Sequence, residues 1–129
     1  MELYVGGSFQ GKLKYVRKKC DISSEAVYTG KEISNLIDKG TKERIILDQF
    51  HLWVRECMKK GENPEEAFEQ ILSACPKCIV ISDEIGNGIV PVDEFEREYR
   101  DRTGRILIEI AKKAEKVERI ICGMGQRLK

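Results

Sequence analysis

The residues best suited to chemistry lie in a glycine-rich stretch near the start of the sequence. Gly6, Gly11 and Lys12 have the G-x4-G-K spacing of a phosphate-binding P-loop. In such a loop, backbone N–H groups surround the phosphates and the lysine neutralises them. We expect this loop to bind the phosphates of a nucleotide, and its candidate binding residues are Gly6, Gly7, Ser8, Gln10, Gly11, Lys12 and Leu13.

Leu13 departs from the P-loop pattern at the position that normally carries Ser or Thr. The hydroxyl of that residue binds Mg²⁺, and a leucine side chain has no atom that can do so. Magnesium can still be held mainly by substrate phosphates and water. The substitution therefore weakens the expectation of catalysis more than that of phosphate binding. The alternative without function is a glycine-rich turn followed by a surface lysine.

Two carboxylates follow predicted strands. Asp48 ends the segment 44–48 and is placed to hold Mg²⁺ through water. It is equally well placed to cap the next helix. Glu84 follows the buried segment 79–82 and could contact a metal or act as general base for a substrate hydroxyl. Asp83 beside it could supply a cap or a second acid.

The remaining reactive side chains are a histidine and a cysteine pair. His51 is the only histidine, and on a predicted helix we expect an ordinary surface or packing residue. Cys75 and Cys78 form a C-x-x-C pair that follows a predicted helix and precedes a strand, the reverse of the usual redox arrangement. We expect free thiols in a structural or incidental pair, with a thiol or metal role as the alternative.

The composition predicts one folded domain over residues 1–129, a single P-loop nucleotide-binding domain. The net charge of +1 excludes the basic excess typical of nucleic-acid binding. No apolar run approaches the roughly 18 residues that cross a bilayer, and no basic leader precedes the first strand. We therefore expect a cytoplasmic protein with no membrane segment and no nucleic-acid partner.

Hydrophobic periodicity predicts alternating strands and helices. This order is typical of a P-loop NTPase-like α/β fold, a mostly parallel sheet with helices on both faces. The carboxyl ends of parallel strands meet at one edge, so the glycine loop, Asp48 and the turns 83–88 and 123–125 should converge there. The first predicted strand begins near Leu3, and the other predicted strands cover 26–29, 44–48, 79–82 and 119–122. The predicted helices cover 12–19, 31–39, 50–60, 63–74 and 93–117.

Several segments resemble the adenosylcobinamide kinase / adenosylcobinamide-phosphate guanylyltransferase family. The segment 82–91, S-D-E-I-G-N-G-I-V-P, is similar to the family's T-N-E-V-G-x-G-I-V-P, and Phe95, Y-R-D at 99–101 and G-R at 104–105 follow it. The glycine loop resembles G-G-x-x-S-G-K-S, and the segment 48–54 resembles D-C-L-T-L-W.

The resemblance implies a P-loop enzyme of cobalamin biosynthesis, often a homotrimer. Family members phosphorylate adenosylcobinamide with ATP or GTP and Mg²⁺, and then transfer GMP from GTP to that phosphate through a histidine intermediate. By position, Gly11 and Lys12 would bind phosphates, Asp48 would lie near the metal, and Glu84 would serve the kinase step. The expected partners are a nucleotide and an adenosylcobinamide-type corrinoid.

The chain also departs from the family pattern. The segment that carries the guanylylated histidine is largely absent, and His51 falls at the position of a threonine. Leu13 and Leu107 replace a serine and an asparagine. The resemblance therefore supports the kinase reaction more than guanylyl transfer. The alternative is a degenerate P-loop protein that binds nucleotide or corrinoid as a regulatory or assembly subunit.

Overall fold

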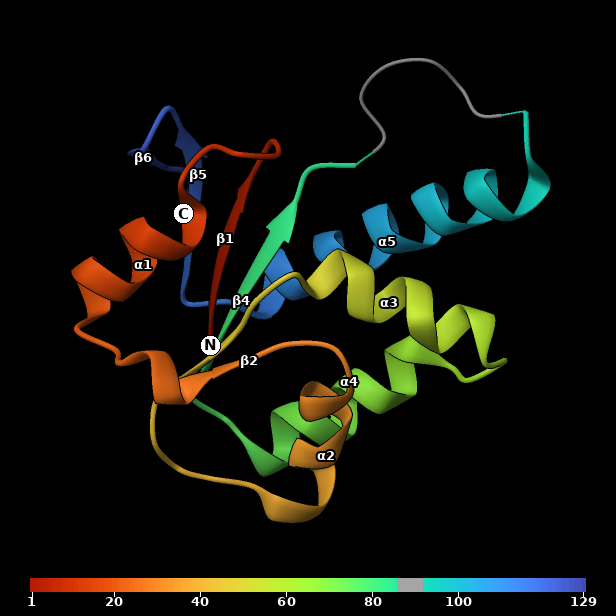
Figure 1. The fold of residues 1–129 in the computed structure, drawn as a ribbon, viewed down its shortest axis with the longest axis horizontal. Helices are drawn as coiled ribbons and strands as arrows, with labels where there is room; N and C mark the ends of the chain where they lie inside the picture. Colours follow the sequence, from red (N-terminus) through yellow and green to blue (C-terminus); the bar gives the residue numbers. More distant parts are fainter. Residues whose placement is uncertain (86–91) are drawn as a thin grey trace.

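The computed structural model contains a six-stranded sheet with the strand order β2-β3-β4-β1-β5-β6 (Figure 1). The structure describes residues 1–85 and 92–129. The strands are β1 (Glu2–Gly6), β2 (Val27–Tyr28), β3 (Ile45–Leu47), β4 (Cys78–Asp83), β5 (Lys116–Ile121) and β6 (Met124–Arg127). The helices are α1 (Lys12–Cys20), the 3₁₀ turn Ser24–Ala26, α2 (Lys31–Lys39), α3 (Phe50–Lys59), α4 (Pro64–Ala74) and α5 (Glu94–Lys113).

The strands β1 to β5 are parallel, and β6 returns antiparallel to β5. Strand β1 lies between β4 and β5, so the glycine loop that follows it leaves from the middle of the sheet. The predicted parallel α/β sheet is confirmed. Its carboxyl-terminal edge brings the loop after β1 beside the ends of β3 and β4, as the alternation of elements predicts.

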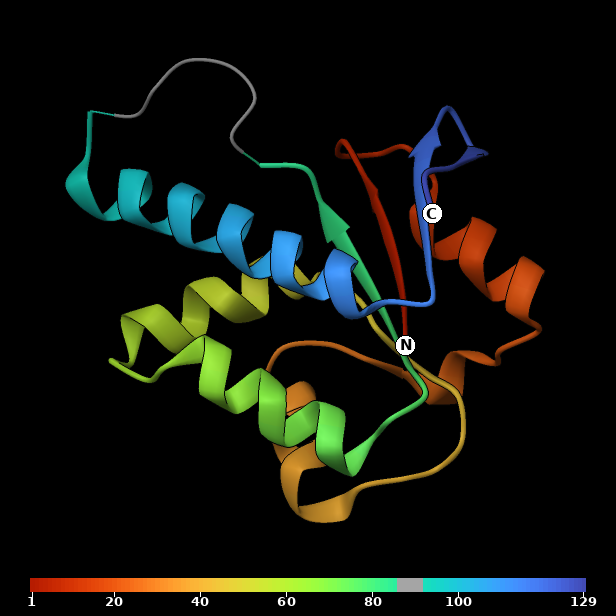
Figure 2. The ribbon, with the colours of Figure 1, turned by 180° about the vertical axis from the view of Figure 1, so that it is seen from behind.

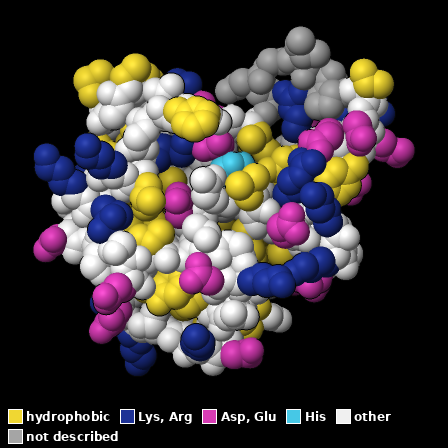
Figure 3. Space-filling model, viewed as in Figure 1, with side chains coloured by type: hydrophobic (Ala, Val, Ile, Leu, Met, Phe, Trp, Pro, Cys, Tyr) yellow, Lys and Arg dark blue, Asp and Glu magenta, His cyan; other side chains and the backbone are white. Residues whose placement is uncertain are grey.

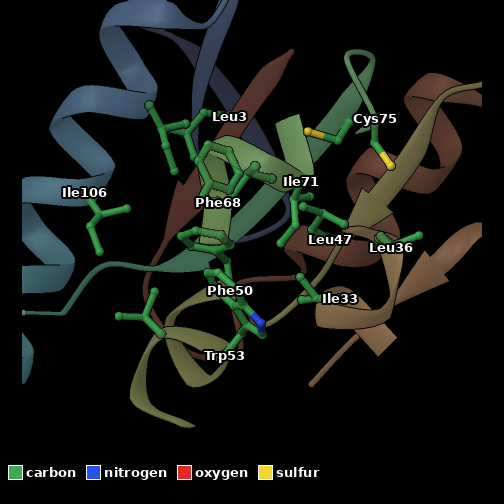
Figure 4. Packing of buried hydrophobic residues seen from close by; sticks show 14 of the residues in the cluster. Leu3, Ile33, Leu36, Leu47, Phe50, Trp53, Phe68, Ile71, Cys75 and Ile106 are labelled. Atoms are coloured by element: carbon green, nitrogen blue, oxygen red, sulfur yellow. The ribbon is translucent and has the colours of Figure 1, made fainter. Parts of the chain in front are cut away.

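Helices cover both faces of the sheet, which also confirms the prediction. Figure 2 shows α1 on one side and α3, α4 and α5 on the other. Side chains alternate along the strands: Leu3 and Val80 belong to the core beneath α2–α5, whereas Tyr4 and Ile79 pack with Val16 of α1. In the larger core, the rings of Phe50 and Phe68 meet edge to face with centroids 5.3 Å apart (Figure 4).

The helix starts follow local chemistry. Asn63 Oδ1 accepts a hydrogen bond from the Glu66 N–H at 3.0 Å, and Pro64 occupies the first helical position of α4, as predicted. Asp93 caps α5 in the same way through the Glu96 N–H. Among the described residues, none of the helices combines the length and apolar character that a membrane crossing needs.

The prediction of the last helix was wrong at its end. Helix α5 stops at Lys113 instead of residue 117, and β5 begins at Lys116 instead of 119. Val117 continues the apolar stripe of the helix, but it pairs with Leu3 of β1 and is buried on the sheet. Tertiary pairing therefore outweighs a short helical periodicity. The terminal segment, expected only as a turn, forms β6. The predicted glycine loop after Glu84, with its family-like segment, lies partly outside the described residues, at 86–91.

Candidate functional site

The carboxyl-terminal edge of the sheet carries a pocket of about 450 Å³. Its walls come from the glycine loop and the start of α1, from the turn into α3, and from the end of β4. In Figure 3 the imidazole of the single histidine, in cyan, is visible between acidic and hydrophobic side chains. The lining residues are Ser8 to Lys14, Asp48, Gln49, His51, Leu52 and Ile81 to Asp83.

Lys12 is the first residue of α1, and its side chain is only 9% exposed. Its ammonium donates to the Gly7 carbonyl at 2.7 Å and lies 2.7 Å from Asp83 Oδ1. The first backbone bond of the helix runs from the Tyr15 N–H to the Gly11 carbonyl. The N–H groups of residues 12–14 therefore precede the helical ladder, at the end of a helix that favours anions. The pocket thus combines a buried cation with a helix N-terminus, the chemistry that binds phosphate.

Two glycines have steric reasons to be there. A Cβ on Gly6 would lie 2.5 Å from the Ile120 carbonyl oxygen of β5. Gly11 has a φ of +79°, a left-handed conformation that glycine adopts without strain. Phe9 also has a positive φ, 59°, and its ring is fully exposed. Positions 6 and 11 therefore need glycine for the loop to take this shape.

Gln10 ties the loop to the turn between β5 and β6. Its side-chain Oε1 accepts from the Cys122 N–H at 2.6 Å, and its backbone carbonyl accepts from the Gly123 N–H at 2.9 Å. The residue was predicted to bind phosphate. In the structure its side-chain oxygen supports the loop, and the residue also lines the pocket.

Asp83, expected from the sequence only as a cap or a second acid, is the centre of the site. Ser8 Oγ donates to Asp83 Oδ2 at 2.9 Å, and His51 Nε2 lies 3.4 Å from the same oxygen. Burial would raise the pKa of this carboxyl, but hydrogen bonds from Lys12 and Ser8, with the charges of His51 and Lys12, leave it lowered. Asp83 therefore stays ionised beside Lys12. The available signal was its place at the end of the strand paired with β1.

His51 is a buried partner of Asp83. The side chain is 7% exposed, and its Nδ1 accepts a hydrogen bond from the Asp83 backbone N–H at 3.1 Å. An accepting Nδ1 places the proton of the neutral ring on Nε2, which faces the carboxylate. Burial lowers the pKa of His51, and the charge of Lys12 adds to this while Asp83 opposes it. The Tyr99 hydroxyl donates to the His51 carbonyl at 2.8 Å, which fixes the first turn of α3 against α5.

Asp48 lines the same pocket. Burial raises the pKa of its carboxyl, and Asp83 adds to the rise, while the Gln49 N–H and Lys12 oppose it. The N-cap of α3 is Gln49, with a φ of +55° and no side-chain cap bond, so the alternative role of Asp48 as the cap was wrong. The pocket therefore holds two carboxylates, and Lys12 is paired with one of them, Asp83.

Glu84 lies away from this cluster. Consecutive residues at the end of a strand point to opposite faces, and Arg119 of β5 holds the Glu84 carboxylate through two bonds, of 2.7 and 3.1 Å. The Glu84 N–H donates to the Gly6 carbonyl at 2.8 Å. The structure thus brings Lys12, Asp48, Asp83 and His51 together and leaves Glu84 with Arg119.

The pocket offers few oxygen ligands for a magnesium ion. Asp48 offers an oxygen ligand, whereas Leu13 offers none and Asp83 is occupied by Lys12. Within residues 1–85 and 92–129, no three His, Cys, Asp or Glu side chains are grouped so that they could hold a metal ion. An ion here would need phosphate oxygens and water as its other ligands.

The cysteine pair lies between α4 and β4, in the predicted order. Cys75 and Cys78 are free and buried, and Cys75 is part of the core (Figure 4). Burial raises the pKa of the Cys78 thiol to about 12 and also raises that of Cys75. Neither thiol is poised to form a thiolate, which favours the structural interpretation.

Comparison with known proteins adds a family to this geometry. The model of the family described as "Cobinamide kinase / cobinamide phosphate guanyltransferase" matches residues 9–128. The bifunctional adenosylcobalamin biosynthesis protein CobU of Escherichia coli K12 is 30% identical over 81 residues, 60% of this chain and 44% of that protein. CobU of Salmonella typhimurium LT2 is 29% identical over 93 residues, which are 71% of this chain and 43% of that protein. CobP of Pseudomonas aeruginosa PAO1 is 29% identical over 91 residues, which are 66% of this chain and 53% of that protein. The match spans about half the length of these curated relatives.

Proposed function

Since the chain belongs to the cobinamide kinase / cobinamide phosphate guanyltransferase family, we propose that it binds ATP or GTP in the pocket around Lys12 and phosphorylates an adenosylcobinamide-type corrinoid in cobalamin biosynthesis. The observation that carries the proposal is the buried ammonium of Lys12 at the N-terminus of α1, above the ends of β1 and β4. That position matches a phosphate-binding lysine. The curated relatives are named as adenosylcobalamin biosynthesis proteins, which supports the pathway.

Each residue has a role in the proposed reaction. Lys12 and the N–H groups at the start of α1 bind the β- and γ-phosphates. The substrate hydroxyl oxygen forms a bond to the γ-phosphorus, the bond to the bridging oxygen breaks, and the nucleoside diphosphate leaves. Glu84, which lies outside the phosphate pocket and is paired with Arg119, is proposed to take the proton of a hydroxyl presented from that side. Asp48 would hold Mg²⁺, which when bound neutralises charge on the phosphates.

Guanylyl transfer is not part of this proposal. A nucleophilic histidine needs a ring nitrogen that can reach the phosphorus of GTP. Both ring nitrogens of His51 face Asp83, one its backbone N–H and the other its carboxylate, and the side chain is nearly buried. This arrangement favours a role for His51 in positioning Asp83 and not as a nucleophile.

A second candidate is binding without turnover. Leu13 favours it, because the residue lines the pocket where a hydroxyl would normally hold magnesium. In that case the chain binds nucleotide or corrinoid and acts as a regulatory or assembly subunit.

One assay separates the two candidates. The purified chain is mixed with Mg²⁺, adenosylcobinamide and γ-labelled ATP or GTP, and nucleotide binding, corrinoid binding and labelled corrinoid are measured for wild type and Lys12→Ala. Lys39→Ala, at the end of α2, is the charge-matched control. Labelled corrinoid that disappears only in Lys12→Ala supports the kinase. Binding without product supports the second candidate, and absence of nucleotide and corrinoid binding contradicts both. Protein-bound label from α-labelled GTP that is lost in His51→Ala would contradict the exclusion of guanylyl transfer.

A further inference from the structure

Three hydrogen-bond donors of different chemical types converge on the Asp83 carboxylate. The Lys12 ammonium lies 2.7 Å from Oδ1, the Ser8 hydroxyl donates to Oδ2 at 2.9 Å, and His51 Nε2 lies 3.4 Å from Oδ2. An ammonium, a hydroxyl and an imidazole N–H are also the side-chain donors that bind phosphate oxygens. Two of the donors belong to the glycine loop and its helix, so the converging point lies in the phosphate pocket itself.

We propose that the Asp83 carboxylate is an internal ligand of this phosphate site: it occupies the position of a phosphate oxyanion, and an incoming phosphate has to displace it from Lys12. The inference rests on the proposed nucleotide-binding function. It makes Asp83 a specificity-determining residue, because the affinity for an anion is set by competition with a carboxylate of the same chain.

The backbone around Asp83 allows this exchange without moving the strand. The Asp83 N–H is bonded to His51 Nδ1, and the next N–H, of Glu84, is bonded to the Gly6 carbonyl. Neither bond involves the carboxylate. Displacement therefore needs only a side-chain rotation of Asp83, while β4 keeps its place beside β1.

The competition also selects a class of ligand. A single phosphate that displaces Asp83 only replaces one anion by another on the same donors. A di- or triphosphate gains further bonds to the N–H groups of residues 12–14, which precede the helical ladder. The site should therefore favour oligophosphates over a single phosphate.

The test compares the binding of inorganic pyrophosphate to wild type and Asp83→Asn by titration calorimetry, with EDTA present to remove metal ions. We expect Asp83→Asn to bind pyrophosphate about tenfold more tightly, since one negative charge leaves the pocket while the shape of the side chain is kept. Asp38→Asn makes the same charge change on an exposed residue of α2 and should leave the affinity within about twofold of wild type.

The outcomes distinguish this inference from the proposed function. If Asp83→Asn binds pyrophosphate equally or more weakly, the internal-ligand inference is wrong. The proposed phosphate site still stands in that case if wild type binds pyrophosphate and Lys12→Ala does not. If neither wild type nor Asp83→Asn binds pyrophosphate, the internal-ligand inference fails, and the nucleotide-binding assay with Mg²⁺ decides the proposed function separately.

A measurement on the wild-type chain keeps the test independent of the folding of the variant. With ¹³C-labelled aspartate carboxyl groups, pyrophosphate should shift the Asp83 resonance strongly, because the carboxylate loses its contact with Lys12. The resonance of Asp38, which lies in α2 and does not line the pocket, should not move. An unchanged Asp83 resonance at saturating pyrophosphate would overturn the inference.

Discussion

Gly6 and Asp83 are register partners at the ends of β1 and β4. The pairing continues past the strands, because the Glu84 N–H donates to the Gly6 carbonyl at 2.8 Å. Residues far apart in the chain are thereby held at one height on the sheet edge. This is why the glycine loop that follows Gly6 closes over Asp83, and why Lys12 finds a carboxylate at 2.7 Å.

Gly6→Ala should destabilise the fold. The added methyl would meet the Ile120 carbonyl oxygen at 2.5 Å, and this obstacle is a backbone atom of β5 and not a flexible side chain. We expect a loss of about 2 kcal/mol or more in the free energy of unfolding, measured by urea denaturation. Gly104→Ala is the control: nothing lies within 4 Å of its added Cβ, and in helix α5 it should stabilise by roughly 0.5–1 kcal/mol. Equal effects of the two changes would refute the steric argument.

Leu13→Ser should make nucleotide binding depend on magnesium. The variant places a hydroxyl at the start of α1, where it can hold an ion together with phosphate oxygens. We expect Mg²⁺ to tighten nucleotide binding about tenfold more in the variant than in wild type, measured by calorimetry with and without Mg²⁺. Leu13→Ala removes the same apolar side chain from its packing against the α1 core and adds no oxygen. If Mg²⁺ changes nucleotide binding equally in both variants, the added hydroxyl does not cause the magnesium dependence.

Glu84→Gln should slow phosphoryl transfer without weakening nucleotide binding. If Glu84 is the proton acceptor, the rate of corrinoid phosphorylation should fall at least about 100-fold. Nucleotide affinity should change little, because Glu84 faces Arg119 and not Lys12. Arg119→Gln breaks the same ion pair but keeps the carboxylate, and should retain most of the rate. Similar losses in both variants would mean that Glu84 acts only through the ion pair.

Stability should depend on pH through His51. Burial lowers the pKa of its ring in the folded chain, so the unfolded chain binds the proton more readily. The free energy of unfolding should therefore decrease as the pH falls through the ordinary value of about 6.5, and level off below the folded pKa. The slope is at most about 1.4 kcal/mol per pH unit.

His51→Gln should remove this part of the pH dependence, since the chain has one histidine. Urea unfolding of both proteins between about pH 5 and 8 measures it. A second loss of stability is expected at more acidic pH, because the pKa of Asp83 is also lowered and its ion pair with Lys12 ends when the carboxyl is protonated. A His51→Gln profile parallel to that of wild type would contradict the role of the histidine.

The order of the elements from β1 to β5 and the position of the glycine loop could be predicted from the sequence. These depend on local physics: apolar runs, the period of the helices, the cap at Asn63 and the spacing of Gly6, Gly11 and Lys12. The rule that parallel strands end at one edge was enough to place Asp48 near the loop.

The identity of the carboxylate that faces Lys12 could not be predicted from the sequence. Asp83 and Glu84 are neighbours with similar side chains, and a shift of one residue in the pairing of β4 with β1 would exchange their faces. Val117 likewise has the spacing of a helical residue in the sequence, but it pairs with Leu3 as part of β5. Register is set by long-range packing, so the local pattern could identify the loop and its lysine but not the partner of that lysine.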